Sequence, residues 1–278
     1  MRVEKSFLKW IGSKNRIIDQ LLPYLPIGES HCTRLIEPFV GAGNVFINTN
    51  YQSYIIGDSN RDLMNVYVWL YDNLALLVNT AESLFNDNLD YYEVRHLFNN
   101  CQPFDRDSVE QAARFIWLMR HCFNGICRYN KSGKFNTPKG NYKKVYFPKQ
   151  ELINFSNKLN SHELLMLSVD FTETLGYADY GDVIYCDPPY LSASENDSFV
   201  GYTPGGFDFI GTIALRDCLI KAVRKGAIAI VSNSDNAITR DIFSDFERYT
   251  ITAPRRVAAN GNRQPAKELI CVLTPDML

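Results

Sequence analysis

The segment Asp182-Val183-Ile184-Tyr185-Cys186-Asp187-Pro188-Pro189-Tyr190 decides the fold, because it joins an apolar strand to a chemically unusual turn. Residues 182–186 form a short apolar run that predicts a buried strand. Two consecutive prolines end such a strand abruptly and stiffen the turn after it. The turn therefore presents a carboxylate, a proline carbonyl and an aromatic ring at the carboxyl edge of a strand, where open α/β sheets bind their ligands.

These groups suit an amino group on a flat heterocycle. The Asp187 carboxylate and the Pro188 carbonyl can accept hydrogen bonds from the two protons of an –NH2 group. Pro189 stiffens the turn, and the Tyr190 ring can stack on the heterocycle. The alternative at this point is an ordinary strand-ending Pro-Pro turn with no ligand, so the rest of the chain has to decide.

Composition places the chain among globular proteins. It has 278 residues, 46% hydrophobic and 22% charged, which allows one large domain or two smaller ones. The charged start of the chain does not predict a signal peptide, and no apolar run approaches the ~18 residues of a membrane span. The cysteines are odd in number and lack CxxC pairs, which favours reduced thiols in a cytoplasm. The nearest approach to a zinc pattern, His121-Cys122 beside Cys127, is weak, and we expect no metal.

The charge of the chain is unevenly distributed. The net charge of −2 by itself argues against a nucleic-acid partner. However, every charged residue from Arg114 to Lys149 is a lysine or arginine, whereas the preceding stretch, 72–110, is predominantly acidic. Such segregation is typical of a surface that binds an anionic polymer.

The first part of the chain predicts half of a nucleotide-type crevice. A candidate strand at 33–40 runs into Gly41-Ala42-Gly43, and a helix is expected from Asn44 to Asn48. A second strand, 54–57, ends in Asp58, and an acidic residue there usually holds ribose hydroxyls. The glycines allow close approach of a ligand, but no P-loop or full dinucleotide pattern is present. These features indicate an adenosine-containing cofactor without the phosphate grip of a nucleoside triphosphate site.

Two residues before the first strand are also candidates. Trp10 is by default a core aromatic residue. Gly12-Ser13 predicts a turn and an N-cap for a helix over 15–22. Lys14 then lies at a helix start, where a cation gains nothing from the macrodipole, and this misplacement hints at a ligand carboxylate or phosphate.

A helical insertion follows the second strand. Helical periodicity covers 63–85, 91–98 and 109–119 with no intervening strand, which predicts a separate lobe. The lobe ends in a basic, aromatic and amide-rich stretch, 121–144, with a hairpin tip at Ser132-Gly133. Such residues can read base edges, contact phosphates and stack on the bases of a nucleic acid. The alternative is a solvated basic loop with no such role.

The chain then returns to α/β alternation. We expect helices at 150–159 and 212–224 and strands at 164–168 and 227–231, the latter followed by Ser232-Asn233. Asp170-Phe171 places a polar and an aromatic residue at another strand end. A Ser/Asn/Gly-rich loop covers 192–206 and is expected to be mobile. The tail, 249–253 and 268–273, predicts an antiparallel pair whose connection carries Arg255, Arg256, Arg263 and Lys267.

Taken in order, these motifs resemble the Dam-type DNA adenine-N6 methyltransferases over about residues 7–273. The matching stretches are Phe7-Leu8-Lys9-Trp10, Glu37-Pro38-Phe39-Val40-Gly41-Ala42-Gly43, Asp58, Asn124-Gly125-Ile126-Cys127-Arg128-Tyr129-Asn130, Tyr142-Lys143-Lys144, Tyr146-Phe147-Pro148, Asp187-Pro188-Pro189-Tyr190 and Ser232-Asn233. The resemblance implies an α/β fold, a doubly wound methyltransferase sheet with an inserted, mainly helical target-recognition domain that carries a basic hairpin. Residues 1–60 and 160–278 would form the catalytic domain, and residues 61–159 the inserted domain.

The resemblance also implies the cofactor, the target and the roles of residues. S-adenosylmethionine would be the methyl donor, S-adenosylhomocysteine the product and double-stranded GATC the target. The implied cofactor-binding residues are Trp10, Lys14, Glu37, Phe39, Gly41, Gly43, Asp58, Asp170, Phe171 and Asp187. The implied DNA-binding residues are Lys9, Phe123, Asn124, Arg128, Asn130, Pro138, Tyr142, Lys143 and Lys144.

Within that DNA-binding set the implied roles differ. Lys9 matches the residue that reads the outer guanine. Arg128, with Asn124 and Pro138, matches the group that reads the central and later bases. Phe123 stands where relatives place an aromatic wedge. Two departures from the family pattern occur, because Ser13 replaces the second glycine of a Gly-Gly pair and Asn141 stands where some relatives have arginine.

The mechanism implied is base flipping followed by methyl transfer, with Asp187, Pro188, Pro189 and Tyr190 as the catalytic motif. We expect a monomer in the cytoplasm of a bacterial or phage-infected cell. Two other classes remain open. One is a methyltransferase for another amine, such as a glutamine amide or cytosine, although those relatives typically carry Asn or Ser in place of Asp187. The other is a non-catalytic DNA-binding protein, against which the intact Asp187–Tyr190 motif argues.

Overall fold

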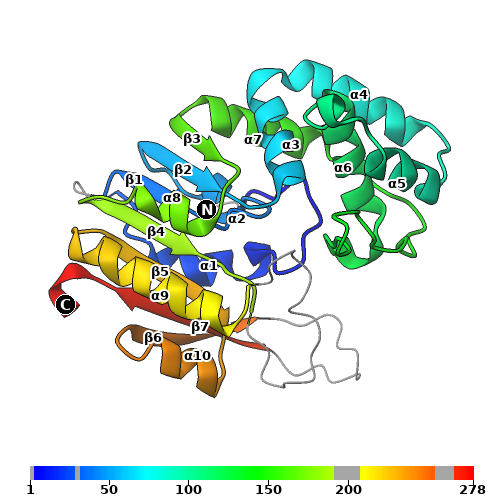
Figure 1. Cartoon of the computed structure of the whole chain (residues 1–278). Helices are drawn as coiled ribbons and strands as arrows, with labels where there is room; N and C mark the ends of the chain where they lie inside the picture. Colours follow the sequence, from blue (N-terminus) through cyan, green and yellow to red (C-terminus); the bar gives the residue numbers. More distant parts are fainter. Residues whose placement is uncertain (1–2, 29–31, 191–206, 254–265) are drawn as a thin grey trace.

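The computed structural model describes residues 3–28, 32–190, 207–253 and 266–278 (Figure 1). The loop expected at 192–206 lies outside these residues, as do Arg255, Arg256 and Arg263. In the described chain, no helix is long and apolar enough to cross a membrane.

A mixed sheet forms the centre of one half of the molecule (Figure 1). Its strand order is β3-β2-β1-β4-β5-β7-β6, and β7 runs antiparallel to both of its neighbours. The strands are β1 Arg34–Glu37, β2 Ser53–Gly57, β3 Glu163–Leu167, β4 Asp182–Cys186, β5 Ile228–Ser234, β6 Glu247–Ala253 and β7 Ala266–Leu273. β1 and β4 are parallel neighbours, but from β1 the chain adds β2 and β3 on one side, and from β4 it adds β5 on the other. This change in the order of strands creates the switch point where doubly wound sheets bind ligands. This topology confirms the predicted fold class.

The central strands form because their residues are apolar on both faces. All five residues of β4 are buried, as expected for a parallel strand covered by helices on both sides. β1 and β4 are joined where both strands begin. There, Arg34 Nε and Nη2 donate to the two carboxylate oxygens of Asp182 at 2.8 and 2.7 Å. Such bidentate pairs add geometric precision, so β1 and β4 meet the switch point in a set register.

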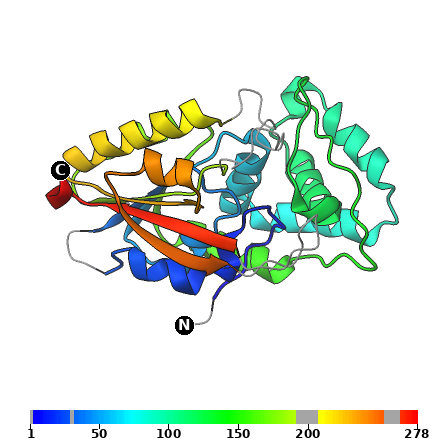
Figure 2. The same ribbon diagram turned by 90° about the horizontal axis from the view of Figure 1, so that it is seen from below.

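Helices cover both faces of the sheet (Figure 2). On one face, α8 Phe171–Gly176, α9 Phe209–Arg224 and α10 Ala237–Ile242 pack on side chains such as Ile184 and Val231. On the other, α1 Ile18–Leu21 and α2 Asn44–Asn48 pack on Val183 and Tyr185. Alternate residues of β4 therefore serve opposite layers, which is the period-two rule for strands.

The residues between β2 and β3 form a helical segment beside the sheet (Figure 1). Its helices are α3 Arg61–Asp72, α4 Leu74–Asn86, α5 Tyr91–Asn99, α6 Val109–His121 and α7 Lys149–Asn160. A single helix over 63–85 was wrong, because Asn73 ends α3 and caps α4 by accepting a hydrogen bond from the Leu76 N–H at 3.0 Å. Short side-chain acceptors favour such caps over helix interiors.

Short 3-10 turns complete the described structure. They are Lys14–Arg16, Leu22–Tyr24, Pro103–Asp105, Phe123–Gly125 and Pro275–Met277. The helix expected over 15–22 is therefore only the four residues of α1 between two such turns. Ser13 precedes the first turn without capping it, since its hydroxyl instead accepts a hydrogen bond from Asn44 Nδ2 at 3.0 Å. The predicted Ser13 cap was thus wrong, but the residue ties this turn to α2.

Candidate active site at the switch point

Asp187 is the polar centre of the site, and its two carboxylate oxygens lie in different surroundings. Oδ1 accepts hydrogen bonds from Lys14 Nζ at 2.7 Å and from Ser232 Oγ at 3.2 Å. Ser232 is itself held by the Tyr185 hydroxyl at 2.8 Å. Oδ2 makes no hydrogen bond with any residue the structure describes. One oxygen is therefore anchored and the other is available to a ligand.

The other residues of the turn differ in burial. Pro188 is buried, Pro189 is exposed and Tyr190 is partly buried. The ladder between β4 and β5 ends at Cys186, and no backbone N–H of the described residues donates to the Pro188 carbonyl. A second acceptor thus remains beside Asp187, as binding both protons of an amino group requires.

Lys14 links the turn to the edge of the sheet. Its side chain is buried, and its ammonium lies 2.9 Å from Glu268 Oε1 on β7 as well as 2.7 Å from Asp187. It also donates to the Tyr190 hydroxyl and lies 4.7 Å from the centre of that ring. The carboxylates near this lysine are therefore the protein's own, whereas the sequence pointed to a ligand.

Burial shapes the electrostatics of the turn. Burial raises the pKa of Asp187 to about 6, against the opposing effect of the Lys14 ammonium. The pKa of Glu37 lies well above its usual range, first because of burial and second because of the nearby Asp187 charge. Among the described residues, the buried Oε1 atom of Glu37 has no hydrogen-bond partner, and such buried atoms are rare.

The glycine loop beside this turn is closely packed by the protein's own aromatic side chains. Gly41 and Gly43 have φ values of +48° and +67°, which side chains rarely adopt. A Cβ atom on Gly41 would lie 3.2 Å from Trp10 Nε1, and one on Gly43 would lie 2.6 Å from the Phe155 ring. The loop therefore needs glycine at both positions, and Trp10 packs directly against it.

Asp58 fixes the same loop from β2. Its Oδ2 accepts from the Gly41 N–H at 3.1 Å and its Oδ1 from the Asn60 N–H at 2.9 Å. Burial nevertheless raises the pKa of Asp58 to about 6. Tyr67 of α3 donates its hydroxyl proton to the Gly41 carbonyl. The loop is thus held from a strand and from the helical segment at once.

Three aromatic rings line the neighbouring part of the edge. Phe39 stacks on Phe171 with ring centres 5.4 Å apart, and Phe207 meets them edge-on at 5.5 and 5.7 Å. Asp170 caps α8 by accepting from the Thr172 N–H at 3.0 Å. The sequence pointed to Phe39, Asp170 and Phe171 but not to Phe207, whose only signal is an aromatic residue just before α9.

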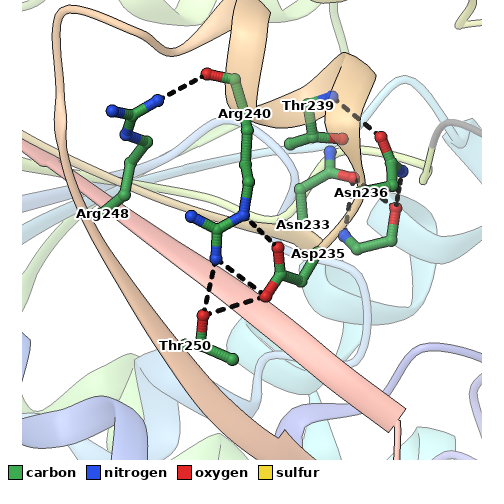
Figure 3. Close-up of polar contacts among 8 residues, drawn as sticks. Asn233, Asp235, Asn236, Thr239, Arg240, Arg248 and Thr250 are labelled. Atoms are coloured by element: carbon green, nitrogen blue, oxygen red, sulfur yellow. Dashed lines mark hydrogen bonds and ion pairs between the residues drawn. The ribbon is translucent and has the colours of Figure 1, made fainter.

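The conformation of β5 beyond Ser232 is stabilised by a polar brace (Figure 3). Arg240 on α10 donates to both carboxylate oxygens of Asp235 at 2.5 and 3.0 Å and to Thr250 Oγ1 on β6 at 2.8 Å. Asn233 accepts from the Ser234 N–H at 2.8 Å, while its buried Nδ2 lacks a partner. The brace connects Asp235, which follows β5, with α10 and β6.

Several of the residues predicted to bind DNA lie where the N-terminal segment meets the helical segment. The backbone of residues 9–11 docks against the Phe123–Gly125 turn, where the Ile11 N–H donates to the Gly125 carbonyl at 3.2 Å. A Cβ atom on Gly125 would lie 2.7 Å from the Lys9 carbonyl carbon, so only glycine permits this approach. The tertiary structure therefore brings Lys9 beside Phe123 and Asn124, which lie far from it in sequence.

Lys9 and Tyr142 also lie together. Lys9 Nζ is 3.5 Å from the centre of the Tyr142 ring and donates to the Arg120 carbonyl at 3.2 Å. Burial, and then the charge of Arg120, lowers the pKa of Lys9. The Tyr142 hydroxyl donates to the Cys122 carbonyl at 3.0 Å and accepts from the Asn124 N–H at 3.1 Å. These contacts hold the turn that presents Phe123, which is 48% exposed.

The predicted hairpin is present. Tyr129 and Phe135 form an antiparallel bridge, and the Asn130 side chain accepts from the backbone N–H groups of Ser132 and Lys134 at 3.0 Å each. Arg128 Nε donates to Asn136 Oδ1 at 2.6 Å across the hairpin. Asn130 therefore shapes the tip, while Arg128 is oriented from the facing strand.

The other predicted residues here lie on the outer surface. Pro138, Lys143 and Lys144 are exposed, and the Pro138 carbonyl accepts from the Phe123 N–H at 2.9 Å. The weak zinc candidates are engaged elsewhere, since His121 stacks on Trp117 and Cys127 accepts from Asn60. No described residues form a group of three or more potential metal ligands.

Fold and site together define a methyltransferase with a doubly wound sheet. The chain belongs to the D12 class N6 adenine-specific DNA methyltransferases, whose family model matches residues 10–257. It is similar to proteins named DNA adenine methylase: 37% identical to that of Serratia marcescens (98% of this chain, 99% of the relative), 35% to that of Vibrio cholerae (100% and 99%) and 33% to that of Escherichia coli K12 (100% and 98%).

Membership decides between the classes that the sequence left open. The chain is an S-adenosylmethionine-dependent enzyme that methylates adenine N6 in DNA, which confirms the predicted activity and cofactor. A methyltransferase for glutamine or cytosine and a non-catalytic DNA-binding protein are both inconsistent with that family.

Proposed function

We propose that the enzyme methylates the adenine of double-stranded GATC after flipping that base into the Asp187–Tyr190 pocket. The observation that carries this proposal is the asymmetry of Asp187, with Oδ1 anchored by Lys14 and Ser232 and Oδ2 open beside the Pro188 carbonyl. A base inside a duplex cannot reach such a pocket, so extrusion of the target nucleotide is required. The full-length similarity to proteins named DNA adenine methylase supports the target.

The edge of the sheet fits S-adenosylmethionine. The glycine loop has no room for a Cβ atom, and Oε1 of the buried Glu37 carboxyl has no hydrogen-bond partner among the described residues. Asp58 would hold the ribose hydroxyls, and Trp10, Phe39 and Phe171 would surround the remaining adenosine. When bound, the cofactor supplies an electrophilic methyl group on a sulfonium.

The protein's own residues then position the amine. Tyr190 would stack on the flipped adenine, while Asp187 Oδ2 and the Pro188 carbonyl accept from the two N6 protons. These acceptors direct the N6 lone pair toward the methyl group, so catalysis consists of positioning and electrostatic stabilisation. A carboxylate with a pKa of about 6 is ionised at neutral pH, as this role requires.

The helical segment would read the DNA. We infer that residues 61–159 form a target-recognition domain inserted into a catalytic domain of residues 1–60 and 160–278. The exposed Phe123 would act as the wedge, with Asn124, Arg128 and Pro138 reading bases alongside Lys9. The residues that would contact the backbone or shape the surface are Asn130, Tyr142, Lys143 and Lys144.

The test is expression in a host that lacks adenine methylation. Nucleoside mass spectrometry of the host DNA should detect N6-methyladenine, and sequencing that resolves modified bases should place it in GATC. The Asp187→Ala protein, expressed at the same level, should leave the DNA unmodified. Methylation at another sequence would overturn the proposed target, and N4-methylcytosine in place of N6-methyladenine would overturn the proposed chemistry.

A further inference from the structure

Glu268 is a buried carboxylate on β7 that none of the roles above requires. Its side chain is 8% exposed, and its Oε1 lies 2.9 Å from the ammonium of Lys14. We propose that Glu268 is a positioning residue for methyl transfer, because it holds Lys14 where that lysine fixes Oδ1 of Asp187 and the Tyr190 hydroxyl. The inference rests on the proposed function of the Asp187–Tyr190 turn.

Lys14 needs such an anchor for two physical reasons. A lysine side chain has a flexible four-carbon stem, so it can adopt many rotamers. Its ammonium here is almost fully buried, and a buried charge is costly unless it is paired. The contacts of Lys14 with Asp187 and Tyr190 both come from one turn, whereas Glu268 adds a carboxylate from β7 and so further restricts the position of Nζ.

Glu268 comes from a rigid element. In the sheet, β7 pairs with β5, with Glu268 opposite Ser234 and Ile270 opposite Ser232. Ser232 donates directly to Asp187 Oδ1, so adjacent strands act on the same oxygen, one directly and one through Lys14. Groups placed on strands hold their geometry more closely than groups on loops.

The charges around Asp187 make the proposal testable by pH. Asp187 is faced by Lys14, by Glu268 on β7, by Glu37 on β1 and by the phenols of Tyr185 and Tyr190. Neutralising Glu268 changes the pKa of Asp187 in a direction that depends on whether Lys14 keeps its position. If Lys14 stays in place, losing a neighbouring negative charge lowers the pKa of Asp187, but if Lys14 leaves, losing the ammonium raises it.

The experiment is kcat/KM for a GATC duplex from pH 5 to 9 with the wild-type enzyme and Glu268→Gln, an isosteric neutral variant. We expect a loss of roughly tenfold at pH 8, smaller than the ~10²–10³ typical of a group that touches the reacting atoms. The acid limb should move to higher pH, because Lys14 is released. In a Lys14→Met background, adding Glu268→Gln should change the rate little.

Matched controls separate this role from a structural one. Glu247→Gln makes the same exchange at an exposed carboxylate on β6 and should change neither rate nor pH profile. Duplex binding by fluorescence anisotropy should be unchanged in Glu268→Gln. If that variant does not fold, Glu268→Asp keeps the charge but shortens the reach, and should lower kcat and move the acid limb to higher pH by less than Glu268→Gln would.

Several outcomes would overturn the proposal. They are an acid limb that moves to lower pH, a wild-type rate in the Glu268 variants, or additive losses with Lys14→Met. Asp187→Ala, measured in parallel, distinguishes failure of the positioning role of Glu268 from failure of the proposed function. If it abolishes methylation while Glu268→Gln does not lower it, only the positioning role fails, whereas persistence of methylation in Asp187→Ala refutes the proposed function itself.

Discussion

At the scale of single residues, the site depends on different surroundings for two oxygens of one carboxylate. Asp187 Oδ1 is anchored by Lys14 and Ser232, while Oδ2 has no partner among the described residues. Hydrogen bonds from charged donors are shorter and stronger than neutral ones, so the anchored oxygen orients the whole group. The second oxygen is therefore left open to a ligand, and on this we base the proposal that it accepts a hydrogen bond from the target amine.

The first prediction concerns this residue. Asp187→Ala should reduce kcat by at least ~10²–10³, the usual cost of removing one preorganised electrostatic group. Single-turnover methylation of a GATC duplex measures the effect. The loss should occur without unfolding, which circular dichroism can establish, and a variant with near-normal turnover would refute the assignment of the catalytic turn.

The second prediction concerns Asp58 and the cofactor. Asp58→Ala should weaken binding of S-adenosylmethionine by roughly 1.5–3 kcal/mol, the value of a hydrogen bond to a charged group. Because Asp58 also holds the Gly41 N–H at 3.1 Å, part of this loss would come from the loop. Isothermal titration calorimetry measures the affinity for S-adenosylmethionine. The control is Asp107→Ala, which removes an exposed carboxylate paired with Arg61. Unchanged affinity in Asp58→Ala would show that β2 does not end at the cofactor.

At the scale of elements, the hairpin between Tyr129 and Phe135 is built to hold one guanidinium. Asn130 closes the tip, and Asn136 accepts from Arg128 through both its side chain and its backbone carbonyl. A planar guanidinium held in this way suits bidentate contact with a guanine edge. The lysines at 143 and 144 are exposed and suit phosphate contact instead.

The third prediction follows from that contrast. Arg128→Ala should lose ~1–3 kcal/mol of discrimination at one position of GATC, so near-cognate sites gain relative activity. Lys143→Ala should weaken binding to all sequences alike and reduce the salt dependence. Methylation rates on GATC and every singly substituted site, at two salt concentrations, separate the two roles. An equal loss on all sites in Arg128→Ala would make Arg128 a phosphate contact.

At the scale of the whole molecule, the helical segment and the sheet share one hydrophobic cluster. Phe155 of α7 is fully buried and contacts Phe7, Phe46 and Tyr67, which come from the N-terminal segment, α2 and α3. Its ring also lies against Gly43 of the glycine loop. Packing between the helical segment and the sheet is therefore continuous with packing against the glycine loop.

The fourth prediction tests this connection. Phe155→Ala should lower the free energy of unfolding by ~3–5 kcal/mol, the usual cost of a large buried aromatic residue. Phe104→Ala, at a position 84% exposed, is the matched control and should change stability little. Urea denaturation of both variants provides the comparison. A loss in Phe155→Ala no larger than the control would mean that the two parts are not stabilised by each other.

The sequence by itself determined those features whose signal lies in contiguous residues. The β4 strand and its Pro-Pro turn, the Gly41–Gly43 loop, Asp58 after β2 and the hairpin tip all follow from local backbone chemistry. Helix boundaries were less secure, because apolar periodicity continues through Asn73, and only the cap geometry shows that α3 ends there. The family resemblance supplied the order of these parts along the chain.

The tertiary structure alone decided which distant residues meet. Ser232 and Glu268 join the site because the sheet places β5 beside β4 and β7 beside β5, an order that no local pattern encodes. Phe207 joins it by packing on Phe39 and Phe171. Lys9 reaches Phe123 and Tyr142 only because Gly125 lets two backbones touch. Contacts of this kind depend on strand order and packing, which are set by the whole hydrophobic core, so the partners of Asp187 and Lys14 could not be read from the residues around them.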